Sequence, residues 1–202
     1  MCWILPESLD LQMTAGSAAP GGVKSVHTIM RNKPIYIGCD DSGYEAKLHL
    51  LELFEVQKLS YVDCGSGKEP SRYPYYAAKV AQAVSLGKAN FGILLCGSGI
   101  GMSIAANKFP GVRAAAVSDS YSARLTRRHN DSNVLCLGGG LMGAWQIEEI
   151  VKVWLGTEYD AGHHEPSLAL IRDIEARNMS GELWCPENTP YSPFLWNPEQ
   201  EL

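Results

Sequence analysis

The stretch FGILLCGSGIGMSIAANK, residues 91–108, decides the fold of this 202-residue chain. Its apolar beginning predicts a buried strand of the kind found in parallel sheets covered on both faces. The glycine-rich turn that follows exposes backbone N–H groups at the start of a helix, an arrangement that binds anions. Cys96 lies at the lip of this turn, where a helix N-terminus favours the thiolate. A base or nucleophile beside an anion hole indicates chemistry that passes through an oxyanion.

On both sides of this turn, short apolar runs alternate with helical patterns. The expected strands are 35–39, 61–64, 91–96, 113–117 and 134–137, and the expected helices are 44–58, 73–87, 102–108, 121–128, 145–155 and 166–177. Strands that alternate with helices predict an α/β fold with a parallel sheet. We therefore expect a doubly wound, Rossmann-like five-stranded parallel sheet of order 2-1-3-4-5, with helices on both faces.

The alternating region covers only part of the chain. We expect an N-terminal arm at 1–33, an α/β domain at 34–178 and an aromatic, proline-rich C-terminal arm at 179–202. Trp3, Trp184, Phe194 and Trp196 in these arms are costly to leave in water, because burial stabilises by roughly 25 cal/mol per Å² of apolar area. The two arms are therefore expected to serve as assembly or lid elements.

The composition indicates which partners the chain is not expected to have and where in the cell it is expected to work. The formal net charge is −5 without a basic stripe, so a nucleic-acid partner is not expected. No apolar run is long enough to span a membrane. The six cysteines form no CxxC pair, and four of them lie in or beside strand-like runs, which indicates reduced thiols in a cytoplasmic protein.

The topology predicts where a site forms. In a sheet of this order, ligands bind at the carboxyl ends of the first and third strands. Asp40 and Asp41 follow the first strand and Cys96 follows the third, so two carboxylates and a thiol should converge there. His129 closes a helix that ends at the opposite edge of the sheet. We expect it to reach such a site only from a second subunit.

Plainer interpretations of these residues remain open. Asp41 or Ser42 could simply cap the next helix, and His129-Asn130 could be an ordinary helix C-cap. His163-His164 lies in an expected loop, where a solvated pair is more usual than a metal pair. The run 138–143 matches G-x-G-x-x-G, but no further strand follows to complete a dinucleotide-binding unit. No cofactor and no metal are expected.

Taken together, the motifs resemble the family of type B ribose-5-phosphate isomerases and galactose-6-phosphate isomerase subunits, over roughly residues 34 to 177. The matching residues are Gly38-Cys39-Asp40 with Gly43, Asp63 with Gly65, Tyr73-Pro74 with Ala77, the run 96–108, Tyr121-Ser122-Ala123 with Leu125, Arg128-His129-Asn130-Asp131, and Trp154-Leu155-Gly156. The run 96–108 is the most specific of these. The two arms have no counterpart.

The resemblance implies an isomerase that interconverts aldoses and ketoses without a metal, through a cis-enediolate, as a homodimer or a dimer of dimers with shared active sites. By the same resemblance, Cys96 would move the proton, and Ser98 with the backbone N–H groups of Gly97, Gly99 and Gly101 would hold the enediolate oxygen. His129 would open the sugar ring with Asp40. Asn130 would hydrogen-bond a substrate hydroxyl. Apart from the resemblance, Asp41, Tyr73, His163 and His164 are expected as further substrate contacts.

The chain departs from this family where phosphate is usually held. Members of the family generally have a histidine at the position of Asp41. They also place an arginine in the turn after the fifth strand or in the loop before the last helix, but residues 138–141 and 162–167 of this chain contain none. An added carboxylate and missing guanidiniums disfavour a dianion. Arg113, Lys108, His163 and His164 are the alternative phosphate-binding groups, and a sugar without phosphate at that end is the other possibility. A metal-assisted enzyme using Asp40 and Asp41 with His163 or His164, and a non-catalytic sugar-binding relative, remain as competing functions.

Overall fold

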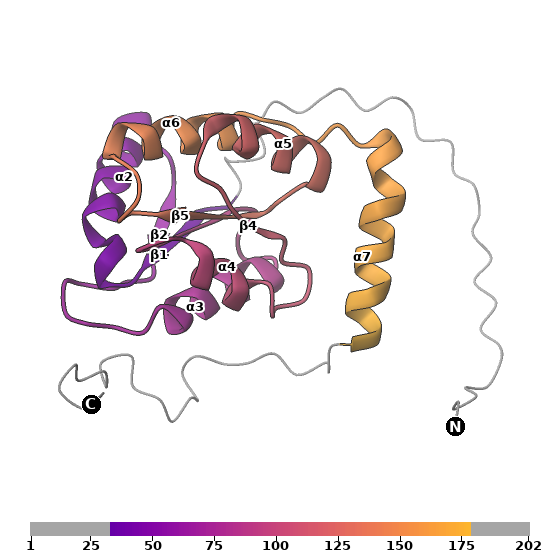
Figure 1. Cartoon of the computed structure of the whole chain (residues 1–202), viewed down its shortest axis with the longest axis horizontal. Helices are drawn as coiled ribbons and strands as arrows, with labels where there is room; N and C mark the ends of the chain where they lie inside the picture. Colours follow the sequence, from indigo (N-terminus) through magenta and orange to yellow (C-terminus); the bar gives the residue numbers. More distant parts are fainter. Residues whose placement is uncertain (1–32, 179–202) are drawn as a thin grey trace.

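A computed structural model describes residues 33–178, which form one parallel sheet with helices on both faces (Figure 1). The strands are β1 (Ile35–Cys39), β2 (Tyr61–Asp63), β3 (Gly92–Cys96), β4 (Ala114–Ala116) and β5 (Val134–Gly138). The helices are η1 (Asp41–Gly43), α2 (Tyr44–Gln57), α3 (Tyr73–Ser85), α4 (Ile100–Ala106), α5 (Ser120–Asn130), α6 (Ala144–Leu155), η2 (Gly162–His164) and α7 (Glu165–Asn178). The predicted C-terminal arm, and the N-terminal arm up to residue 32, lie outside the described residues.

The fold class is confirmed, and the strand order needs one correction. The sheet runs β2-β1-β3-β5-β4, so β5 rather than β4 pairs with β3. Burial explains the order. Every residue of β5 is buried, which suits a central strand, whereas the three alanines of β4 are half-buried or exposed and suit an edge. The predicted crevice between β1 and β3 is unaffected, because these two strands still pair with each other.

Two apolar layers hold the sheet. Alternate strand side chains such as Ile37, Leu95 and Leu137 pack under α2, α5 and α6, around the fully buried Trp154. The intervening side chains, such as Leu94 and Cys136, pack against α3 and α4 on the other face. Figure 1 shows the two helical layers above and below the sheet. The alternation explains why the strand sequences read as continuous apolar runs.

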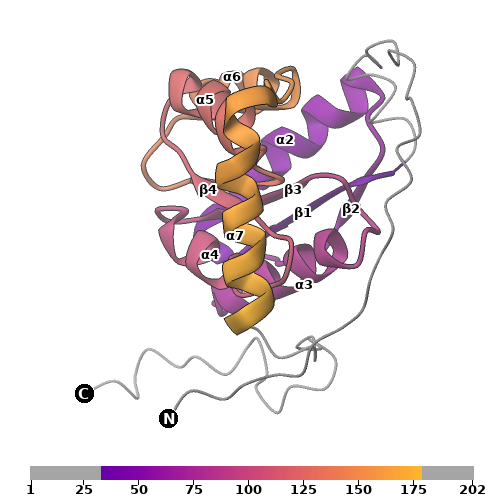
Figure 2. The ribbon, with the colours of Figure 1, turned by 90° about the vertical axis from the view of Figure 1, so that its right-hand side faces the viewer.

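The last helix stands apart from these layers. Figures 1 and 2 show α7 beside the β4 edge, running from the α5–α6 layer toward the α3–α4 layer. Leu168 is buried, but Leu170, Ile171 and Ile174 are 45–59% exposed. Within residues 33–178 no helix is long and apolar enough to cross a membrane, and Cys39, Cys64, Cys96 and Cys136 are free.

Candidate functional site

The loops that follow β1, β3 and β5 are tied together through their backbones at the carboxyl edge of the sheet. The amide of Asp40 donates to the Leu95 carbonyl, with N and O 3.2 Å apart. The amide of Gly139 donates to the Cys96 carbonyl at 2.8 Å, and the amide of Gly140 to that of Gly97 at 3.1 Å. These bonds hold the glycine-rich turn between its neighbours. The predicted convergence of the first and third loops is therefore present.

Cys96 is buried, with 6% of its surface exposed, and its sulfur accepts a hydrogen bond from the amide of Gly99 at 3.1 Å. Gly99 has φ +76°, and a Cβ there would lie 2.9 Å from backbone atoms of Leu137, so glycine alone fits. A hydrogen bond to sulfur stabilises the thiolate more than the thiol. The Gly99 amide is therefore already hydrogen-bonded to the Cys96 sulfur, and it is not free to bind a substrate oxygen.

Ser98 lies in the same turn as Cys96 and is half-buried. Its Oγ accepts a hydrogen bond from the amide of Ile100 at 3.3 Å, in the first turn of α4. A hydroxyl that accepts one bond still has a proton to donate. Ser98 can therefore offer a hydrogen bond to a negatively charged oxygen near Cys96.

Asp40 caps the short helix η1 and is almost fully buried. Its Oδ1 accepts from the Ser42 hydroxyl at 2.6 Å and from the Gly43 amide at 3.1 Å. Burial raises the pKa of the Asp40 carboxyl above its usual value, although the two hydrogen bonds act in the opposite direction. A carboxyl with a raised pKa exchanges protons nearer to neutrality, which suits a general acid or base. Asp40 therefore both caps η1 and has the raised pKa that suits an acid or base.

Asp41 and Tyr73 flank this site from the β2–α3 side. Oδ1 of Asp41 accepts a hydrogen bond from the Ser71 amide at 3.1 Å. The Tyr73 ring lies against Gly101, because a Cβ on Gly101 would be 2.7 Å from Tyr73 Cε2. Tyr73 therefore borders the turn that carries Cys96, and Asp41 contacts the loop that leads to Tyr73. The predicted set Asp40, Asp41, Tyr73, Cys96, Gly97, Ser98, Gly99 and Gly101 gathers at one edge of the sheet.

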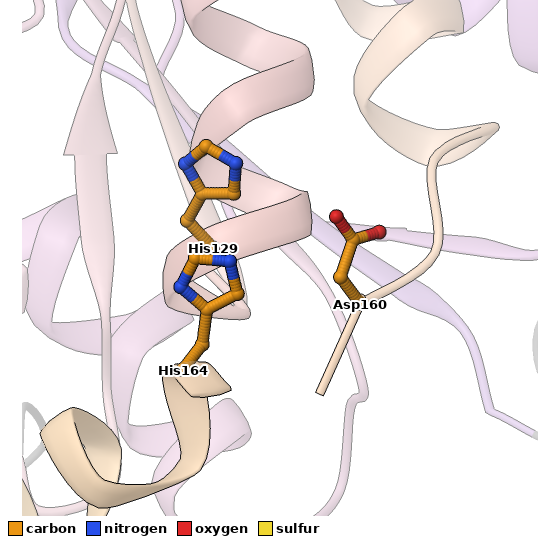
Figure 3. Close-up of side chains that lie close together, drawn as sticks. All are labelled: His129, Asp160 and His164. Carbon is orange, nitrogen blue, oxygen red and sulfur yellow. The ribbon is translucent and has the colours of Figure 1, made fainter. Parts of the chain in front are cut away.

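The other four predicted residues gather elsewhere. His129 and Asn130 end α5, five and four residues before β5 begins, and His163 and His164 follow α6, so all four lie toward the amino edge. The rings of His129 and His164 stack with centroids 4.5 Å apart (Figure 3), and the ring centroids of His163 and His164 are 3.9 Å apart. A five-residue strand separates the two edges by about 16 Å. Within one chain, His129 does not join Cys96.

This separation bears on the competing metal-assisted function. Within one chain, His163 and His164 lie at the edge of the sheet opposite to Asp40 and Asp41, so they do not complete a metal shell with them. Arg113 already has partners in the described structure, because its Nε and Nη2 donate to the Asp131 carbonyl and Nη2 also bonds Asp131 Oδ2 at 2.8 Å. The paths of the loops decide where His163 and His164 lie and which partners Arg113 has, and the sequence pattern does not encode those paths.

Two residues near these groups escaped prediction. Lys47 on α2 is 2% exposed, and its ammonium donates to both oxygens of Asp63 and to the Ser66 carbonyl, each at 2.9 Å. It thereby fixes the loop that leads to Ser71. Asp160 lies beside His129 and His164 (Figure 3). The sequence gives no signal that Lys47, one lysine in a helical pattern, is buried, or that Asp160, one acid in a loop, lies beside the two histidines.

Comparison with known proteins agrees with this geometry. The model of the family described as Ribose/Galactose Isomerase matches residues 35–171. Ribose-5-phosphate isomerase B of Escherichia coli is 42% identical over 146 residues, which cover 72% of this chain and 98% of that protein. D-erythrulose-4-phosphate isomerase of Pectobacterium atrosepticum is 37% identical, over 68% of this chain and 91% of that protein. The structure of ribose-5-phosphate isomerase B from Clostridium thermocellum matches with a TM-score of 0.71 and 40% identity, covering 72% of this chain and 99% of the other.

Proposed function

Because the chain belongs to the ribose/galactose isomerase family, we propose that it interconverts an aldose phosphate and its ketose through a cis-enediolate, with Cys96 as the base. The observation that carries the proposal is the contact between the Gly99 amide and Cys96 Sγ, at a turn bonded to the Asp40 loop. A thiol, a hydroxyl donor and a carboxyl of raised pKa stand there together. No residue of this set requires a metal for proton transfer.

The reaction follows from these positions. The Cys96 thiolate takes the proton from C2 of the open-chain aldose, and the C1 carbonyl oxygen receives the electron pair as an enediolate. Ser98 donates a hydrogen bond to that oxygen as its charge grows, with backbone N–H groups of the turn. The proton on O2 passes to O1, and the Cys96 thiol returns its proton to C1. The product is the ketose, and every group is restored.

Ring opening is proposed to use a second subunit. His129 lies about a strand length from the Cys96 of its own chain, so a partner's copy must supply it. Ile100 and Ile104 lie one turn apart on α4, beside the glycine turn, and are 56% and 58% exposed. Pairing these apolar side chains across a two-fold axis would bring a second chain over the site. His129 from that chain, with Asp40 as its acid–base partner, would open the ring, and Asn130 would hold a hydroxyl.

The position of Asp41 bears on the substrate. Asp41 is exposed, and its carboxylate faces the loop at Ser71 rather than a cation. Relatives of this chain bear names that point to different sugar phosphates, one of five carbons and one of four. We propose a sugar phosphate whose phosphate is gripped by groups other than Asp41, with His163 and His164 of the partner as candidates. The free cysteines of the described region support a reducing cytoplasmic location.

The test is an isomerisation screen. Purified full-length chain is offered pentoses, hexoses and tetroses, each free and phosphorylated, and aldose–ketose conversion is followed. The proposal expects turnover of at least one phosphorylated sugar and unchanged activity after treatment with a chelator. Binding without turnover would favour the non-catalytic relative, and activity lost on chelation and restored by a divalent ion would favour the metal-assisted enzyme.

A further inference from the structure

Three side chains that can each bind a metal ion meet at the end of α5. They are His129 from the last turn of α5, Asp160 from the loop after α6 and His164 from the end of η2 (Figure 3). Their ligand atoms all lie within 4.8 Å of one another, and within residues 33–178 no other group of three such side chains does. The two histidines are half-buried, and the carboxylate is exposed.

These side chains are held in place by contacts of their own. The Asp160 amide donates to the Arg128 carbonyl at 3.0 Å, which fastens the loop to the last turn of α5. The Asp160 carboxylate accepts from Arg128 Nε at 2.9 and 3.1 Å, and the rings of His129 and His164 stack at 4.5 Å with planes 23° apart. The cluster is therefore present before any ion binds.

The geometry points to a site for a divalent transition-metal ion, zinc above all, held by His129, Asp160 and His164. Two imidazoles and a carboxylate match the ligands of zinc, whereas magnesium prefers oxygen alone. Zn–N bonds of about 2.0–2.1 Å place tetrahedral ligand atoms about 3.3 Å apart. The present spacing of up to 4.8 Å closes to that value if the two rings tilt out of their stack. The fourth position would be taken by water, or by His163, whose ring lies 3.9 Å from that of His164.

Arg128 is the one group that opposes such an ion. Its guanidinium contacts Asp160 Oδ2 through Nη2 at 2.8 Å. A carboxylate offers about four lone-pair sites, so Asp160 can hold Arg128 and an ion at once. The positive charge of Arg128 weakens binding without blocking it, which fits a site that fills and empties rather than a permanent structural centre.

An ion bound here would act on the isomerase through His129. This consequence, unlike the site itself, rests on the proposed function. An imidazole nitrogen that ligates zinc can no longer accept or donate the proton for ring opening. Zinc would therefore inhibit the enzyme reversibly, and a chelator would restore it.

The test is a zinc titration of the full chain without an affinity tag, followed by calorimetry at pH 7.5. We expect the unaltered chain to bind one zinc ion that Asp160→Asn and His164→Ala bind more than about 10-fold more weakly. His49→Ala and Glu158→Gln are the matched controls, because His49 pairs with Glu148 on another face and Glu158 lies in the same loop outside the cluster. Both should bind zinc as the unaltered chain does. Zinc sites at cysteines, where present, remain in every variant.

Two results would overturn the site: no zinc binding by the unaltered chain, or equal binding by all five proteins. Circular dichroism of each variant shows that weaker binding is not unfolding. Activity is measured separately, with zinc inhibition expected in the unaltered enzyme and reduced in Asp160→Asn. A chain that turns over no sugar refutes the proposed function, while the calorimetry still decides the metal site.

Discussion

The amide of Gly99 and the sulfur of Cys96 are hydrogen-bonded across the turn that follows β3, at 3.1 Å. The bond depends on a backbone conformation with φ +76° that places Gly99 against the backbone of Leu137. One glycine of the turn therefore positions the sulfur of Cys96, the proposed base, through a direct hydrogen bond. Gly99 thus both packs the turn against β5 and holds the sulfur of Cys96.

Gly99→Ala should lower both stability and activity. The left-handed conformation costs a non-glycine residue about 1–2 kcal/mol, and the new Cβ would lie 2.9 Å from Leu137, so the turn must shift. Urea unfolding and kcat measure the two effects. Gly143→Ala is the matched control, because Gly143 has φ −71° and open space around its Cβ position. Equal behaviour of the two variants would show that the turn is not constrained as described.

Asp40→Asn should stabilise the chain at neutral pH and reduce its activity. Burial raises the folded-state pKa of Asp40, so the ionised carboxylate is disfavoured in the fold. Such a group contributes stability that is complete below the unfolded pKa of about 3.9 and is lost as pH rises through the folded value. The stability advantage of the amide should therefore be present at pH 7 and vanish near pH 3. Urea midpoints at several pH values test this, and an advantage that grows toward acid would contradict it.

Asp41→Asn should improve the use of phosphorylated sugars. If the substrate phosphate passes near Asp41, removing one negative charge lowers KM and raises kcat/KM by about tenfold, or about 1.4 kcal/mol. Asparagine keeps an oxygen to accept from the Ser71 amide, so the loop stays in place. Asp41→His, assayed beside it, separates added positive charge from lost negative charge. Efficient use of ribose 5-phosphate by the unaltered chain, with no gain in either variant, would show that Asp41 does not oppose phosphate.

A mixture of inactive chains should recover activity. Cys96→Ala and His129→Ala each destroy a different part of a site that two chains share. After subunit exchange, half of the dimers are mixed, and each mixed dimer carries one intact site, so about a quarter of the full activity should return. Mixing Cys96→Ala with Asp40→Asn is the control, because both residues lie at the same edge of one chain and no intact site forms. The idea fails if the first mixture stays as inactive as its parts.

The sequence correctly predicted that Asp40 and Cys96 meet at the carboxyl edge of the sheet, because that meeting depends on topology. Asp40 and Cys96 follow adjacent parallel strands, and any such pair must meet. The order of β4 and β5 was wrong, since apolar runs show that a strand is buried but not how deeply, and Ala114–Ala116 resembles a core strand until its exposure is known. The grouping of Asp160 with His164 could not be predicted. It depends on the path of a loop fastened by one backbone bond to Arg128.

The central claim, that Cys96 is the base of an aldose–ketose isomerase, is tested most directly by turnover of the Cys96→Ala chain beside Cys136→Ala. Cys136 on β5 belongs to the same buried apolar cluster as Cys96. Burial raises the pKa of the Cys136 thiol, so this thiol stays protonated and inert. Each substitution removes one buried sulfur and should cost comparable stability. We predict that kcat on the best sugar of the screen falls about 10²–10⁴-fold in Cys96→Ala and stays near the unaltered value in Cys136→Ala. Turnover by Cys96→Ala close to that of the unaltered enzyme would contradict the account.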